Sequence, residues 1–128
     1  MEDGDLRLRR AIFEAFAATG EPPAAEDGAT LRALAEQHVV VLDADGRIEM
    51  AHPFAAHDRG ARVDAGGGSW RGSCAWDAFG IVAALGLREA TLTAQGLTLG
   101  VHEEGVEGDA VFHVLVPAAH WWDDIAFT

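Results

Sequence analysis

The chain has a single cysteine, Cys74, and no lysine among its 128 residues. One cysteine excludes a disulfide within the chain, and it also excludes a Cys-x-x-Cys zinc or redox motif. No apolar run reaches the roughly 18 residues that a membrane-spanning helix needs. The charged start MEDGDLRLRR is not followed by an apolar stretch of the signal-peptide type. These absences predict a cytoplasmic protein whose one thiol is either buried and inert or reactive.

Positive charge is also scarce. Nine arginines stand against 21 acidic residues, and the formal net charge is −12. The only basic cluster, at residues 7–10, is offset by acidic residues at positions 2, 3 and 5. Because affinity for nucleic acid depends largely on neutralising phosphates, this charge balance argues against a DNA or RNA partner. We predict a protein that binds neither nucleic acid nor membranes, and the sequence leaves its oligomeric state open.

The length suits one domain, or two small lobes that share a core. Apolar residues spaced by three and four predict an amphipathic helix over residues 5–19. Thr30 is expected to cap a second helix over residues 31–38. A hairpin signal follows, with strands at 39–42 and 47–51 around the turn DADG. The order helix, helix, hairpin predicts a winged-helix-like lobe over residues 1–54, or alternatively a helical cap on a sheet.

Residues 55–128 are predicted to form an α+β lobe. The fold class is therefore α+β, with a small helical lobe and hairpin followed by a mostly antiparallel sheet that carries one helix. The glycines at 66–68 are interpreted as a flexible hinge, and residues 103–109 as an acidic turn region. The expected elements are a strand at 61–65, a helix at 74–85, strands at 90–95, 97–102 and 110–117, and a short helix from residue 118.

The stretch SWRGSCAWDAFG, residues 69–80, carries the candidate chemistry. Ser73 is a suitable N-cap, which would put Cys74 in the first helical turn, where the helix dipole favours a thiolate. Asp77 follows at i+3 on the same helix face. Such a pair can bind a soft metal through sulfur and deliver a proton beside it. The alternative is a structural pair, with Cys74 a small buried hydrophobe and Asp77 placed to interact with the helix dipole.

The segment CAWDAFGI (74–81), with AHPF (51–54) upstream, resembles the alkylmercury lyase (organomercurial lyase) family. The resemblance covers most of the chain. It implies cleavage of carbon–mercury bonds by protonolysis, a role in mercury resistance, and no organic cofactor, with external thiols carrying mercury in and out. It also implies that Cys74 and Asp77 are the catalytic and mercury-binding residues, with Cys74 attacking as thiolate and Asp77 passing protons.

One departure from the family is expected to matter. The family uses a second cysteine, in a strand after the segment that corresponds to WWDDIAFT, so the resemblance implies a homologue shortened at its C-terminus. Two functions follow: a lyase that is impaired or that borrows a second thiol, or a non-catalytic protein of the same fold that binds a thiophilic metal or organometal.

Two further groups have open interpretations. His52 and His57 precede the cysteine helix, and they either approach Cys74 as metal ligands or, for His52, stabilise the turn before Pro53. The tryptophans either fill the core or form an apolar wall for an organic group. They are Trp70, Trp76, Trp121 and Trp122.

Overall fold

The computed structural model describes residues 3–24, 28–109, 118–123 and 125. This part of the chain folds as α+β, with three α-helices and two antiparallel sheets, as the sequence predicts. No described helix combines the length and the apolar character needed to cross a bilayer. In chain order the elements are α1 (Asp3–Thr19), α2 (Gly28–Glu36), β1 (Val41–Leu42), β2 (Ile48–Ala51), β3 (Phe54–Ala55), β4 (Ala61–Ala65), β5 (Gly68–Gly72), α3 (Ala75–Leu85), β6 (Glu89–Ala94), β7 (Leu97–His102), β8 (Gly105–Glu107) and a 3₁₀ helix, η1 (Ala118–Asp123).

The first predicted helix is confirmed as α1. Ile12 and Phe16, four residues apart on its inner face, are completely buried. Gly20 ends the helix in a left-handed conformation with φ 76°. A Cβ at this position would collide with the carbonyl oxygen of Ser69. Glycine at position 20 therefore both stops α1 and lets it lie directly against β5.

The second helix differs from its predicted limits of 31–38. It begins at Gly28, so Thr30 lies inside the helix and the prediction that Thr30 caps it is wrong. It ends at Glu36 because His38 takes a left-handed conformation with φ 59°, which the helix cannot continue through.

The predicted hairpin is confirmed as β1 and β2. The Asp43 carboxylate holds its turn by accepting hydrogen bonds from the N–H groups of Asp45 (2.9 Å) and Arg47 (3.0 Å). A two-residue strand, β3, pairs with β2 and completes a small sheet in the order β1-β2-β3. The sequence did not predict β3, because two residues are too few to show an alternating pattern.

The second sheet has five strands in the order β5-β4-β6-β7-β8. The strands predicted at 61–65, 90–95 and 97–102 are confirmed as β4, β6 and β7. The strand β8 lies in the region predicted as an acidic turn. The strand predicted at 110–117 lies outside the described residues, whereas the short helix predicted from residue 118 is confirmed as η1.

The glycine stretch is a tight turn within this sheet, so its interpretation as a flexible hinge is wrong. Gly66 (φ 55°) and Gly67 (φ 83°) form the two-residue turn between β4 and β5, and Ala65 pairs with Gly68. Positive φ at both central positions suits the right-handed twist of the two strands, and glycine adopts it without strain.

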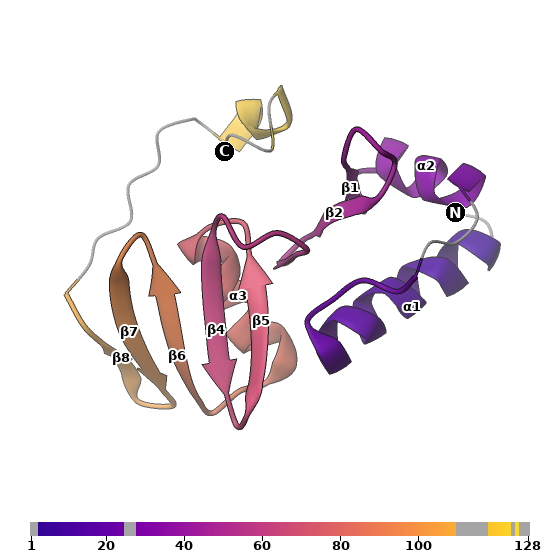
Figure 1. Cartoon of the computed structure of the whole chain (residues 1–128). Coiled ribbons are helices and arrows are strands. Elements are labelled where there is room, and N and C mark those ends of the chain that lie inside the picture. The colour runs from indigo at the N-terminus through magenta and orange to yellow at the C-terminus, as the bar shows by residue number, and fades with distance from the viewer. Residues whose placement is uncertain (1–2, 25–27, 110–117, 124, 126–128) are drawn as a thin grey trace.

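Helix α3 lies behind the five-stranded sheet in Figure 1 and contacts β4, β5 and β6. It buries Ala78, Ile81 and Val82. Helix α1 contacts β5, the strand at the sheet edge. A single core cluster includes side chains from α1, α2, α3 and the sheet strands. Residues on both sides of the predicted boundary at 54/55 therefore share one core.

Candidate functional site

Cys74 stands at the junction between β5 and α3. Its backbone is extended (φ −153°, ψ 174°), it is the N-cap of α3, and its carbonyl oxygen accepts the N–H of Ala78 at 3.1 Å. The expectation that Ser73 caps the helix and that Cys74 lies in its first turn is therefore wrong by one residue. The Ser73 hydroxyl instead donates a hydrogen bond to the sulfur of Met50 in β2, which draws it away from the helix.

Asp77 lies in the first turn of α3, and 15% of its side chain is exposed. The neighbouring strand approaches this position closely, which glycine at residue 72 makes easier. A Cβ on Gly72 would lie 3.0 Å from the Asp77 Cβ, closer than such atoms normally approach. Gly72 thus allows β5 to pack against the start of α3 and holds Asp77 close to the sheet.

The structure brings His52 to this pair. Its Nδ1 lies 3.4 Å from Asp77 Oδ2, although the residues are far apart in sequence. Its Nε2 is buried and has no hydrogen-bond partner among the described residues. For His57, the other histidine of this segment, the hydrogen bond is local: its Nδ1 accepts the N–H of Arg59 at 3.3 Å. His52, rather than His57, is thus the histidine of the site.

The electrostatic setting of the thiol differs from the expectation. Burial raises the pKa of the half-buried Cys74 thiol, and the charge of Asp77 and hydrogen bonding to its carboxylate add to the increase. The backbone N–H groups of Asp77 and Trp76 act in the opposite direction but are outweighed. The helix end therefore does not produce the low-pKa thiolate that the sequence predicted. The protonated thiol is favoured instead.

Arg71 does not offset the rise in the pKa of Cys74. It could have favoured the thiolate by its charge, but its guanidinium is paired with Glu21 beside α1. Nor do the described residues contain a metal cage, because in residues 3–24, 28–109, 118–123 and 125 no three His, Cys, Asp or Glu side chains are arranged to hold an ion. A metal ion bound by Cys74 and Asp77 would therefore need further ligands. These would be substituents that the metal already carries, or groups outside the described residues.

An aromatic side chain from η1 borders the site. The Trp122 ring stacks on His38 (centroids 4.1 Å apart, interplanar angle 8°) and presents an edge-to-face contact to His52 at 5.9 Å. Trp122 is 42% exposed and Trp76 is 64% exposed, so neither is a core residue. Trp70, by contrast, is partly buried and donates its indole N–H to the Ala17 carbonyl at 2.9 Å.

In a comparison with family models, curated proteins and solved structures, nothing matches this chain. The assignment of a function therefore depends on the geometry of Cys74, Asp77 and His52.

Proposed function

We propose that this protein captures organomercurial compounds at Cys74 and cleaves their carbon–mercury bond with a proton delivered by Asp77. One observation carries the proposal: the only thiol of the chain and a mostly buried carboxyl group meet at the first turn of one helix. Soft thiolate is the ligand type that binds soft metals most strongly. A positioned acid beside it is what protonolysis of a metal–carbon bond needs.

Because the raised pKa favours a protonated Cys74, the proposed reaction must account for the thiol proton. Cys74 starts as a thiol; mercury of R–Hg–X bonds to its sulfur, X⁻ leaves, and the thiol proton passes to the Asp77 carboxylate. Asp77 then gives this proton to the carbon. The Hg–C bond breaks with its electron pair on carbon, releasing R–H and leaving Hg(II) on the Cys74 sulfur. External thiols remove the metal, and a cytoplasmic location would supply them in reduced form.

His52 is a positioning residue in this proposal. Its contact with Asp77 at 3.4 Å orients the carboxyl group toward the thiol. We also propose that α1, α2 and the small sheet form a winged-helix-like lobe, which the order of these elements supports. With a net charge of −12, that lobe serves to hold His52 in place rather than to bind DNA.

The test is benzene release from phenylmercury acetate in the presence of excess dithiothreitol, with a blank that lacks protein. We expect release by the wild-type protein and none by Cys74→Ser or Asp77→Asn. The matched control is Asp58→Asn, an exposed aspartate outside the site, which keeps full activity. His52→Ala should slow release without reducing formation of the mercury adduct. Release that persists in Cys74→Ser refutes the proposal.

A second function, capture without cleavage, is favoured by one observation. The 128 residues contain one cysteine, so Hg(II) cannot be held between two thiolates of this sequence. Mass spectrometry of the same samples separates the two functions. A stoichiometric adduct that is lost in Cys74→Ser, without benzene, would establish a binding protein and overturn the lyase.

A further inference from the structure

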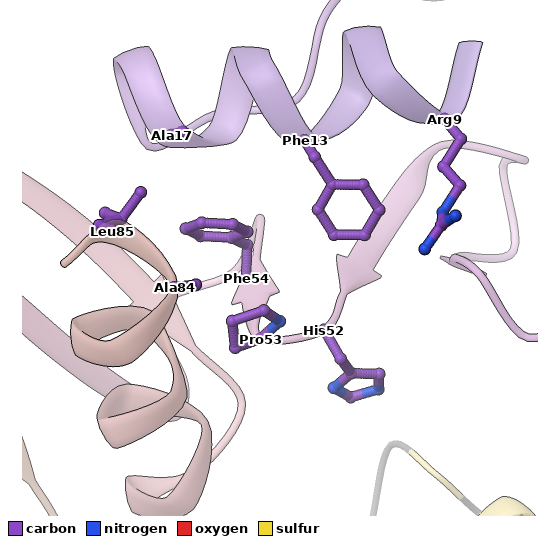
Figure 2. A pocket seen from close by; sticks show the side chains of 8 residues that line it. All are labelled: Arg9, Phe13, Ala17, His52, Pro53, Phe54, Ala84 and Leu85. Carbon is purple, nitrogen blue, oxygen red and sulfur yellow. The ribbon is translucent and has the colours of Figure 1, made fainter. Parts of the chain in front are cut away.

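A cavity of about 360 Å³, open to solvent on one side, lies between α1, the turn from β2 to β3 and the C-terminal end of α3. Figure 2 shows Arg9 and Phe13 projecting from α1 toward the turn that carries His52, Pro53 and Phe54. The remaining lining residues are Ala17, Ala84 and Leu85. Neither Cys74 nor Asp77 lines this cavity, and His52 is the one residue that it shares with their site.

Two phenylalanine rings line the cavity. The rings of Phe13 and Phe54 lie 6.5 Å apart at 55°. Phe54 is itself fixed by a parallel stack on Phe16, with centroids 5.4 Å apart. A volume near the lower end of ordinary ligand sites, bounded by two rings and aliphatic side chains, suits a single small ring.

The charge at the cavity is positive, in contrast to the rest of the protein. None of the lining residues is acidic, although the chain has 21 Asp and Glu residues. The guanidinium of Arg9 lies 5.9 Å from the Phe13 centroid and has no carboxylate partner within the described residues. Most other arginines do have such partners, namely Arg10, Arg59, Arg62, Arg71 and Arg88.

We propose that this cavity binds a small aromatic carboxylate, with its ring against Phe13 and Phe54 and its carboxylate on the Arg9 guanidinium. A planar guanidinium pairs with a carboxylate through two parallel hydrogen bonds, which gives orientation as well as affinity. An anion is repelled by most of this acidic surface, so Arg9 together with the apolar walls makes the cavity selective. The proposal does not depend on carbon–mercury chemistry.

The test uses benzoate as the probe, with binding followed by isothermal titration calorimetry on the full chain. We expect saturable binding that weakens at least about tenfold in Arg9→Gln and in high salt. Arg7→Gln removes the same charge from the same helix outside the cavity and should leave the affinity unchanged. Benzamide, which keeps the ring and lacks the charge, should bind as weakly as benzoate binds to Arg9→Gln.

A second pair of variants tests the location. Ala84→Phe fills the cavity from an exposed position and should abolish binding, whereas Ala83→Phe changes the neighbouring exposed residue and should not. The proposal is overturned if wild-type protein shows no saturable benzoate binding. It is also overturned if Arg7→Gln and Arg9→Gln weaken binding equally, or if Ala84→Phe binds benzoate normally.

Discussion

Phe54 connects the helical N-terminal part of the chain to the site, and its removal should be costly. Its side chain is 3% exposed and stacks on Phe16. Truncating a buried phenylalanine to alanine typically costs about 3–5 kcal/mol, and loss of an aromatic pair is worth roughly 0.5–1.5 kcal/mol beyond the buried area. We therefore expect Phe54→Ala to lower the free energy of unfolding by about 4 kcal/mol, out of a total of about 5–15 kcal/mol for a typical domain.

Urea unfolding followed by tryptophan fluorescence measures this difference from the midpoint and the slope of the transition. Phe54→Leu keeps most of the buried volume and should cost only about 1–2 kcal/mol. Leu6→Ala, at a 47% exposed position of α1, should change the free energy of unfolding by less than about 0.5 kcal/mol. A loss below about 1 kcal/mol in Phe54→Ala would show that Phe54 does not bind α1 to the rest of the protein.

Three further predictions follow from the same structure. Because burial raises the pKa of Cys74, iodoacetamide should alkylate this thiol more slowly at neutral pH in the folded protein than in the urea-unfolded chain. The pH midpoint of alkylation should also lie above that of free cysteine. Equal alkylation rates in the folded and unfolded protein would contradict the raised pKa. Burial, followed by the charge of Arg59, lowers the pKa of His57 in the folded protein. The contribution of His57 to the free energy of unfolding is therefore complete above about pH 6.5 and is lost as the pH falls through the folded-state pKa. NMR titration of the His57 ring checks that its pKa lies below that of free histidine. A Cβ on Gly60 would collide with the carbonyl oxygens of Gly72 and Ser73, so Gly60→Ala should lower the melting temperature and alter Cys74 alkylation, and a variant unchanged in both would refute the clash.

The elements that the sequence predicts well are those whose pattern is local. Residues 5–19 and 74–85 repeat apolar side chains with helical spacing, and both became helices within a few residues of their predicted limits. Residues 90–95 and 97–102 alternate around Gly96, which alone suffices for a hairpin. In each case the residues that form the element also carry the signal.

The site depended on contacts that no local pattern contains. The contact of His52 with Asp77 arises because the β2–β3 turn packs beside the start of α3, an arrangement set by tertiary structure. The pKa of Cys74 reverses direction for the same reason, since burial by neighbouring elements outweighs the local effect of the helix end. Strand β5, rich in glycine and directly after two turn residues, offers too few side chains to show a pattern.

The imidazole of His52 has two neighbours with different chemistry. It lines the aromatic cavity on one side, and its Nδ1 lies 3.4 Å from the carboxyl group beside the thiol. Under the two proposals, a ligand that displaces this ring would change both environments together, and we therefore expect binding at one site to affect binding at the other. If a molecule in the cavity changes the proposed affinity of Cys74 for mercury by some factor, reciprocity requires that mercury on Cys74 change the affinity for that molecule by the same factor.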